Sequence, residues 1–400
     1  MVNVTIKDIK TFLLKPGKTN LIVVKVITSE PGLYGLGCAT FAYRCSAVKK
    51  VVEDYLRPIL IGRNVDDIED LWRLMNFSGY WRCGPIENNA ISGIDMALWD
   101  IKGKIANLPV YSLLGGKLRD YASVYRQVNG LDLDEVGEGI QQFMSQGVEH
   151  IRVQLGNLGA PGRQSWEFPG PEGLRYSPSR YFRDTLELMR FVRSNFGWDL
   201  ELLHDSHERL DPVDALRFAK DLEEFRLFFL EDLLSPEDND WLERIRTQCS
   251  VPIASGELFS HPGEWKHLVT RRLIDYIRVH MSFIGGITPA RKLAAFCEEY
   301  GVKVAWHGPS DVSPIGHAAN LHLDYAMPNF GIQEWTGFTD AELELFPGAP
   351  QLVDGKAYLS DSPGLGIDFR EDLAERYPID DSYWLYRWQV RLNDGTLHAP

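Results

Sequence analysis

The chain has 400 residues, 44% of them hydrophobic, and a formal net charge of −14 at pH 7, which argues against a nucleic-acid or anionic-membrane partner. No apolar run approaches the roughly 18 residues of a membrane helix, and the N-terminal residues lack the pattern of a signal peptide. The five cysteines are odd in number and lack metal-ligand spacing, which indicates reduced thiols and a cytoplasmic location.

The first 118 residues are expected to form an α+β capping domain. Residues 3–39 contain two or three strand-like runs separated by PGK and SEPG turns. Residues 45–76 and 87–107 have the apolar periodicity of helices.

Eight short apolar runs then alternate with amphipathic helical segments. They lie near residues 123–127, 150–154, 200–205, 226–231, 252–257, 275–281, 302–307 and 331–334. The alternation predicts an α/β fold with a (β/α)8 TIM-type barrel over residues 119–345 as the catalytic domain. One connection, after Gln154, is a long Gly/Pro/aromatic stretch, and loops of that length tend to be functional lids. Residues 346–400 are expected to form a tail that packs on the capping domain and the barrel.

Acidic residues and a histidine recur at the ends of these strands. Asp205, Glu231 and Glu257 are 26 residues apart, His307 follows after 50 residues, and Glu334 after 27 more. The C-terminal strand ends of such a barrel converge on the active-site face. Three carboxylates on consecutive strands predict a Mg²⁺ site, because Mg²⁺ prefers oxygen ligands. As an alternative, the three carboxylates could be solvated strand ends or helix caps, but their equal spacing disfavours this.

Two histidines are candidates for chemistry or substrate contact. His207 lies two residues past Asp205, so it is expected on the same face, as a general acid or base. His307 stands at a strand end between Trp306 and Gly308, which favours a catalytic or substrate contact. A packing role is the alternative for both. Glu334, which ends the eighth strand, is expected to contact substrate.

The order of these features resembles the enolase superfamily over essentially the whole chain. Finer motifs are similar to the mannonate dehydratase branch, which shares a family with galactonate dehydratases: HDSHERL (204–210), LED (230–232), SGELF (255–259), GGITPARKLA (285–294), AWHGPSDVSPIGHAANLHLD (305–324) and IQEW (332–335). The resemblance implies removal of the proton α to a carboxylate and loss of the β-hydroxyl as water, giving a 2-keto-3-deoxy acid. Enolase-superfamily sites use a Lys or His base with one or two Mg²⁺ ions.

The resemblance also implies roles for individual residues. Arg152 on the second strand matches the branch and implies a catalytic role. Arg278 on the sixth strand matches an arginine directed at the substrate, although a structural ion pair fits about as well. Asp311 matches a substrate-binding acid, or equally a loop cap. Gln127 ends the first strand, where the branch usually has histidine, and it is expected to contact substrate together with Glu257.

The substrate-contacting positions depart from the branch. The tyrosine that the branch pairs with its arginine falls near Gln164 in this chain, and the nearest aromatics are Trp166, Tyr176 and Tyr181. Ala42 stands where the branch usually has asparagine.

These changes predict a Mg²⁺-dependent aldonate dehydratase with low or no activity on D-mannonate, acting on a related sugar acid such as gluconate. The alternative is a diverged, starvation-sensing-like member that keeps the metal site without this turnover and serves a binding or sensing role. A sugar acid as ligand and a homo-oligomer are expected.

Overall fold

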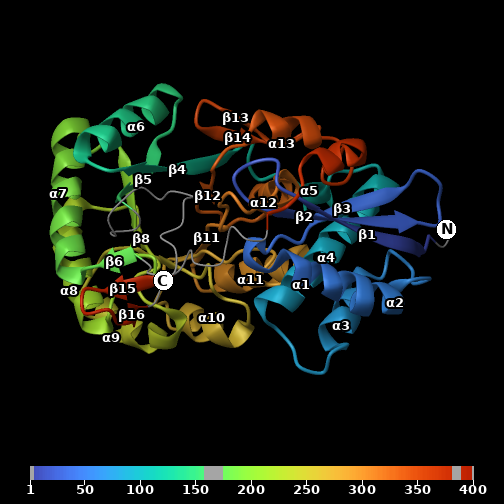
Figure 1. Ribbon diagram of the computed structural model, residues 1–400, viewed down its shortest axis with the longest axis horizontal. Helices are drawn as coiled ribbons and strands as arrows, with labels where there is room; N and C mark the ends of the chain where they lie inside the picture. The colour runs from blue at the N-terminus through green and yellow to red at the C-terminus, as the bar shows by residue number, and fades with distance from the viewer. Residues whose placement is uncertain (1–3, 157–173, 381–388, 399–400) are drawn as a thin grey trace.

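The structure, a computed structural model, describes residues 4–156, 174–380 and 389–398. Its N-terminal domain, blue in Figure 1, lies beside a barrel-like domain formed by the middle of the chain. Within the described ranges, no helix is both long enough and apolar enough to cross a membrane.

The capping domain is a three-stranded antiparallel sheet covered by helices. Its strands are β1 (Ile6–Leu14), β2 (Leu21–Thr28) and β3 (Tyr34–Cys38), in that order. Its helices are η1 (Ala42–Arg44), α1 (Cys45–Lys50), η2 (Val51–Leu56), α2 (Arg57–Leu60), α3 (Ile68–Phe77), α4 (Pro85–Ala106) and α5 (Val110–Leu113). A Cβ at Gly35 or Gly37 would lie 1.9 Å from the carbonyl oxygen of Ala97 or Gly93, so only glycine lets β3 approach α4 this closely.

The barrel prediction is confirmed. Seven parallel strands follow the order β11-β10-β9-β8-β7-β5-β4, and β12 pairs with β4. A parallel bridge between Val304 and Phe330 closes the circle. The strands are β4 (Ala122–Gly130), β5 (His150–Leu155), β7 (Glu201–Asp205), β8 (Phe229–Glu231), β9 (Ile253–Ser255), β10 (Tyr276–Ile277), β11 (Lys303–Val304) and β12 (Gln333–Glu334).

A helix follows each barrel strand. These helices are α6 (Leu133–Ser145), α7 (Pro178–Phe196), α8 (Pro212–Leu222), α9 (Leu242–Arg246), α10 (Pro262–Thr270), α11 (Ile287–Glu299), α12 (Pro314–Ala326) and α13 (Asp340–Leu345), with the short 3-10 helices η4 (Glu223–Phe225) and η5 (Pro236–Trp241). Several begin at the polar caps that unpaired backbone N–H groups require. The Asp132 side chain accepts from Glu135 N before α6, and the Ser313 hydroxyl accepts from Gly316 N before α12.

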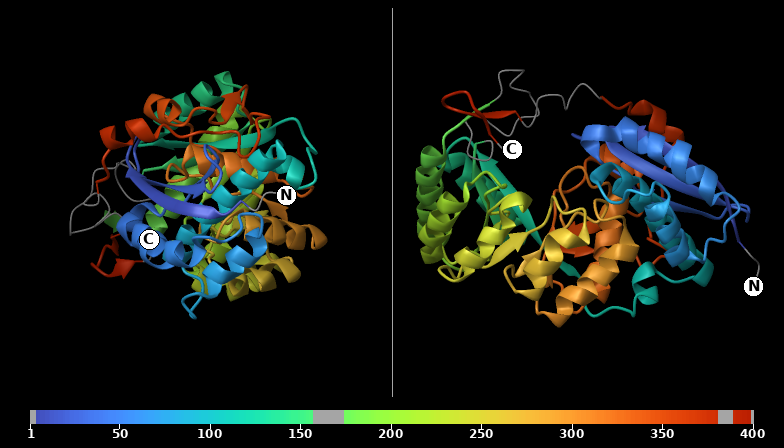
Figure 2. Two further views of the ribbon diagram at one scale, coloured as in Figure 1. Left: turned by 90° about the vertical axis from the view of Figure 1, so that its right-hand side faces the viewer. Right: turned by 90° about the horizontal axis from the view of Figure 1, so that it is seen from below.

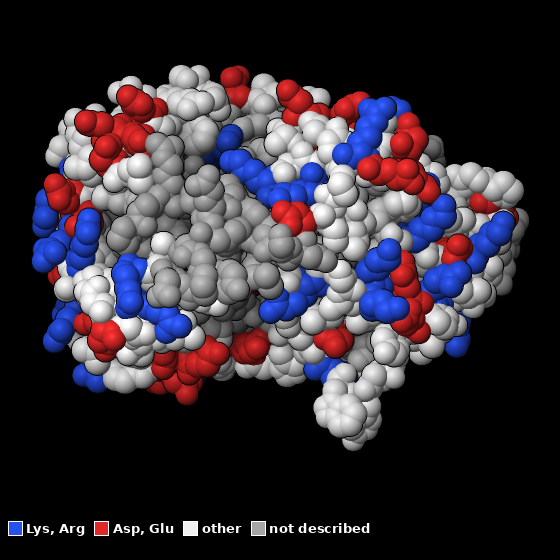
Figure 3. Space-filling view, in the orientation of Figure 1, with Lys and Arg blue, Asp and Glu red and all other residues white. Residues whose placement is uncertain are grey.

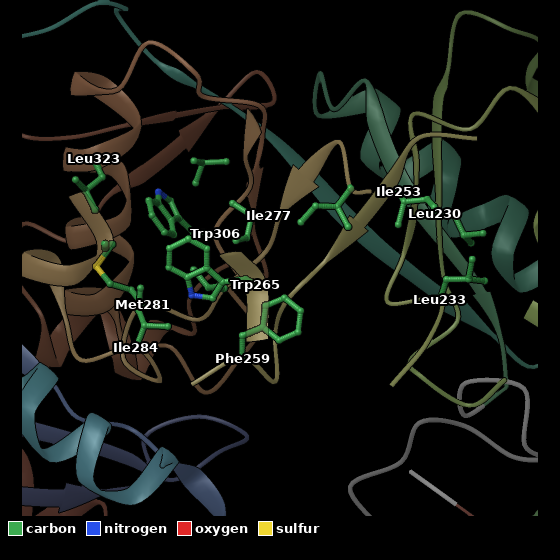
Figure 4. Packing of buried hydrophobic residues seen from close by; sticks show 14 of the residues in the cluster. Leu230, Leu233, Ile253, Phe259, Trp265, Ile277, Met281, Ile284, Trp306 and Leu323 are labelled. Atoms are coloured by element: carbon green, nitrogen blue, oxygen red, sulfur yellow. The ribbon is translucent and has the colours of Figure 1, made fainter. Parts of the chain in front are cut away.

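The main hydrophobic core lies between the strands and these helices. Figure 4 shows side chains from strands, helices and loops in this layer: Leu230, Leu233, Ile253, Phe259, Trp265, Ile277, Met281, Ile284, Trp306 and Leu323. Helix α12 is buried along its whole length, because β3 and α5 of the capping domain also pack against it.

The C-terminal tail contacts three parts of the molecule. Strands β13 (Gln351–Val353) and β14 (Lys356–Tyr358) extend the sheet at β4. The turn η6 (Glu371–Arg376) lies on β1, where Glu371 pairs with Lys10 at 2.8 Å and with Lys25 at 2.9 Å. The last strands, β15 (Val390–Leu392) and β16 (Leu397–His398), form a sheet with β6 (Leu174–Tyr176).

This last contact was not foreseen from the sequence. In Figures 1 and 2, β15 and β16 stand beside the barrel helices α7 and α8, on the side of the barrel away from the capping domain.

Candidate active site

Carboxylates gather at the C-terminal ends of three neighbouring parallel strands. Asp205 ends β7 and Glu231 ends β8, and the two are paired in the sheet register. Glu257 lies two residues beyond β9. All three side chains are buried. The strand arrangement therefore brings together the residues that the spacing singled out.

Two further acids, not predicted, join this cluster. Carboxylate oxygens of Asp205, Glu231 and Asp232 lie within 4.8 Å of one another, and so do those of Glu208, Asp232 and Glu257. Asp232 therefore links the two groups. Both new acids directly follow residues that the sequence had singled out, and both have left-handed backbone, with φ of 62° at Glu208 and 39° at Asp232.

Two buried arginines sit among these carboxylates. Arg152 on β5 pairs with Glu231, with Glu334 at 3.1 Å and with Asp205 at 3.6 Å. Burial alone would lower the pKa of Arg152, but Glu231 and Glu334 outweigh it and raise that pKa. The guanidinium is therefore held protonated and is a poor base in this arrangement.

Arg278 directly follows β10 and is completely buried. It lies 2.9 Å from each of Glu231, Asp232 and Glu334, and 3.3 Å from Glu257. It also donates to the hydroxyl of Tyr125, a buried residue of β4 that the sequence analysis missed. These contacts are those of a structural ion pair, which was one of the two roles expected for Arg278.

Two imidazoles flank the Glu257 carboxylate. The Nε2 atom of His207 lies 3.5 Å from one oxygen, and Nε2 of His307 lies 3.2 Å from the other. Burial lowers the pKa of both histidines, although the nearby carboxylates oppose this. Burial would raise the pKa of Glu257, but the charges of His307, His207 and Arg278 outweigh it and lower that pKa. The cluster thus holds two groups suited to proton transfer.

The donor set fits Mg²⁺. Six buried carboxyl groups, those of Asp205, Glu208, Glu231, Asp232, Glu257 and Glu334, surround the guanidiniums of Arg152 and Arg278. Burial and the neighbouring Glu257 carboxylate raise the pKa of Asp232 to about 8, which marks an excess of negative charge. A divalent cation with a preference for oxygen ligands would balance it.

This charge lies inside the protein rather than on its surface. On the face drawn in Figure 3, blue Lys and Arg side chains and red Asp and Glu side chains both occur across the surface, in several small groups.

Other predicted residues lie around the cluster. The Gln127 side-chain oxygen accepts from Arg152 Nη2 at 2.6 Å, and its amide donates to Asn129 at 2.9 Å. Asp311 is half-buried on the loop before α12, next to Ser310, whose carbonyl accepts from Thr19 of the capping domain at 2.5 Å. Ala42 is buried in η1.

The lid aromatics that the structure describes belong to the hydrophobic core, although the Tyr181 hydroxyl also donates to the backbone carbonyl of Asp205 at 3.4 Å. The Tyr181 hydroxyl is 2.8 Å from Nε2 of His204, whose side chain points to the helix side of β7, opposite to that of Asp205. Tyr176 packs next to Tyr181, with ring centroids 6.0 Å apart. Burial raises the pKa of both phenols. Gln164 and Trp166 lie outside the described residues.

Comparison with known proteins identifies the family. Residues 2–115 match the mandelate racemase / muconate lactonizing enzyme N-terminal domain, and residues 135–373 match the enolase C-terminal domain-like family. A D-galactonate dehydratase family member of Enterocloster bolteae is 52% identical, with 100% of both chains covered. The family member RspA of Pantoea ananatis is 48% identical, again over 100% of both chains.

Solved structures agree. An enolase from Pantoea ananatis with bound D-gluconate and Mg has a TM-score of 0.95 and 47% identity, covering 100% of both chains. A putative dehydratase from Zymomonas mobilis has a TM-score of 0.83 and 30% identity, covering 93% of this chain and 98% of that one. The chain therefore belongs to the enolase superfamily and, within it, to the D-galactonate dehydratase family of sugar acid dehydratases.

Proposed function

We propose that the protein is a Mg²⁺-dependent aldonate dehydratase that prefers a gluconate-like acid to D-mannonate. The observation that carries this proposal is the pair of imidazoles, His207 and His307, on either side of Glu257 within a buried carboxylate cluster. Dehydration of a sugar acid needs one group to take a proton and one to give a proton, next to a cation site. The related Pantoea ananatis enolase holds D-gluconate and Mg, which supports this class of ligand.

The cation would be held by Asp205, Glu231 and Glu257, with Asp232 and Glu208 beside them. Bound there, Mg²⁺ would supply the positive charge that stabilises the substrate carboxylate as the α-carbon loses its proton.

The two imidazoles would divide the proton transfers. His307, whose pKa burial lowers, would accept the proton from C2 of the sugar acid. His207 would donate a proton to the C3 hydroxyl, which leaves as water. The resulting enol then becomes the 2-keto-3-deoxy acid. The negative charge of a bound sugar acid would raise the pKa of His207 and so favour its protonated form.

Weak activity on D-mannonate is supported by three features. Arg152 is held protonated by Glu231 and Glu334. Tyr176 and Tyr181 belong to the hydrophobic core. Gln127 stands where the mannonate branch usually has histidine, and its side-chain oxygen accepts a hydrogen bond from Arg152. A site that lacks the polar partner of a substrate hydroxyl loses large factors in discrimination.

The test is a screen of aldonates with saturating Mg²⁺, read as 2-keto-3-deoxy product. We expect product from D-gluconate or a close relative, and slow or undetectable turnover of D-mannonate. The matched control is Glu231→Gln, which should give no product. A kcat/KM on D-mannonate above about 10⁴ M⁻¹s⁻¹ would contradict the proposed preference.

A second candidate is a sugar-acid-binding protein without turnover. The core placement of both described lid tyrosines favours it, because the base of the mannonate branch would then be lost. Calorimetry separates the two: gluconate binding in the presence of Mg²⁺, with no product from any acid of the screen, would support the binding protein.

A further inference from the structure

The last described residues of the chain form a hairpin beside the active site. β15 runs parallel to β6, with Val390 opposite Leu174 and Leu392 opposite Tyr176. β16 folds back on β15 through an Asn-Asp-Gly-Thr turn in which Gly395 has a φ of 95°. Val390 is buried in the main core, so the hairpin is anchored to the barrel.

His398, at the end of this hairpin, makes two specific contacts. Its ring stacks on Tyr176, with centroids 5.2 Å apart and planes 17° from parallel. Its Nε2 atom is 2.8 Å from the backbone carbonyl oxygen of Arg209. A carbonyl oxygen only accepts, so His398 donates this hydrogen bond through Nε2–H.

Arg209 ends a strained turn that carries two site residues. His207 and Glu208 both have left-handed backbone, with φ of 49° and 62°. Non-glycine residues in this region cost about 1–3 kcal/mol each and persist where several contacts fix them. Here the His207 N–H donates to Asp205 at 2.7 Å, and the Glu208 N–H donates to the Asp232 carbonyl at 2.7 Å.

We propose that His398 is a positioning residue that holds the turn of residues 206–210, and with it the His207 imidazole, in working geometry. Hydrogen bonds to Asp205, Glu231 and Asp232 tie this turn to the strand ends, and the bond from His398 ties it to the tail. The catalytic part of this inference rests on the proposed dehydratase function. The structural part does not, because the turn exists whatever the substrate is.

Two variants separate the donor from the ring. His398→Phe keeps an aromatic ring on Tyr176 and removes the N–H. His398→Gln keeps an N–H donor and removes the ring. The control is Tyr176→Phe, which leaves the stack in place and removes a buried hydroxyl that has no hydrogen-bond partner among the residues that the structure describes.

The first measurement is hydrogen exchange of the intact protein, followed by mass spectrometry of peptides over residues 206–210 and 174–178. Loss of one hydrogen bond should speed exchange of the turn about fivefold in His398→Phe. We expect the β6 peptide to keep its protection, and His398→Gln and Tyr176→Phe to resemble the unmodified protein. Unchanged exchange of residues 206–210 in His398→Phe would overturn the proposal, and so would equal opening of the turn in the Phe and Gln variants.

The second measurement is turnover of a sugar acid that the screen identifies. His398→Phe should lower kcat roughly tenfold with little change in KM, because a displaced acid slows the chemical step more than binding. His398→Gln should restore most of the rate. Altered exchange with an unchanged kcat would refute the catalytic part alone. If the screen finds no substrate, the proposed function fails while the exchange result still decides the role of His398.

Discussion

Replacement of Arg278 by methionine is the most direct test of how the carboxylate cluster is held. The completely buried guanidinium pairs with Glu231, Asp232 and Glu334 at 2.9 Å and with Glu257 at 3.3 Å. Met replaces the arginine side chain as far as Nε and supplies no charge. Breaking a buried ion pair by removing one partner costs about 3–5 kcal/mol, because the remaining charge stays buried without compensation.

We expect the free energy of unfolding of Arg278→Met to fall by that amount. Several carboxylates lose their partner at once, which increases the loss of stability. Protonation of one of these carboxylates limits the loss of stability, since each unit of pKa shift corresponds to about 1.4 kcal/mol.

The assay is urea unfolding followed by tryptophan fluorescence, at pH 7 with a chelator present so that no added cation replaces the lost charge. The matched control is Arg291→Met. Arg291 pairs with Glu69 at 3.2 Å, but both side chains are more than a third exposed, so solvent screens the pair. Its loss should change stability by less than about 1 kcal/mol.

The competing role for Arg278 is contact with substrate. If Arg278→Met loses no more stability than Arg291→Met and instead raises KM for the sugar acid, the guanidinium faces substrate and the structural interpretation is wrong.

Three further predictions concern the metal, the acid and the contact between the domains. Glu231→Gln should weaken Mg²⁺ binding strongly in a calorimetric titration, because one ligand charge is lost; unchanged affinity would remove Glu231 from the site. His207→Asn should lower kcat about 100-fold while Mg²⁺ affinity is retained, and full turnover would show that the acid lies elsewhere. Burial raises the pKa of Asp95 to about 7, whereas the same carboxyl in the unfolded chain releases its proton near pH 4. The contribution of Asp95 to the free energy of unfolding therefore falls as pH rises from about 4 to about 7. Asp95→Asn can still accept the hydrogen bond from Thr288 N. As pH rises, its free energy of unfolding should therefore increase relative to that of the unmodified protein by at most about 1.4 kcal/mol per pH unit, measured by urea unfolding at pH 5, 6 and 7. A difference that stays constant with pH would contradict this.

The sequence predicted the barrel because its strands are separated by near-constant intervals. The same spacing singled out Asp205 and Glu231, which the register places opposite each other. It missed Asp232 for a physical reason. Adjacent residues of a regular strand point to opposite faces, which would turn Asp232 away from Glu231. A φ of 39° breaks that alternation and lets both carboxylates join the cluster.

Other features were hidden by distance along the chain. β6 and β15 have three residues each, too few for a periodic pattern, and they come from segments more than 200 residues apart. Helical structure was expected over 45–76, and the structure divides this stretch into α1, η2, α2 and α3. Pro58, which cannot donate a backbone hydrogen bond, lies in the first turn of α2.

The path of the tail determines when the protein can finish folding during its synthesis. Lys10 pairs with Glu371, which lies 361 residues later in the chain. At about 5–20 residues per second, roughly 20–70 s separate the synthesis of these two partners. During that time the capping sheet lacks its cover of η6 and, for most of it, β4 lacks its edge strand β14; the hydrogen bond from His398 to Arg209 forms later still. The contacts of β14, η6 and His398 therefore form only after all eight barrel strands have been synthesised, and a chain cut just after β12 would keep those strands without these three contacts.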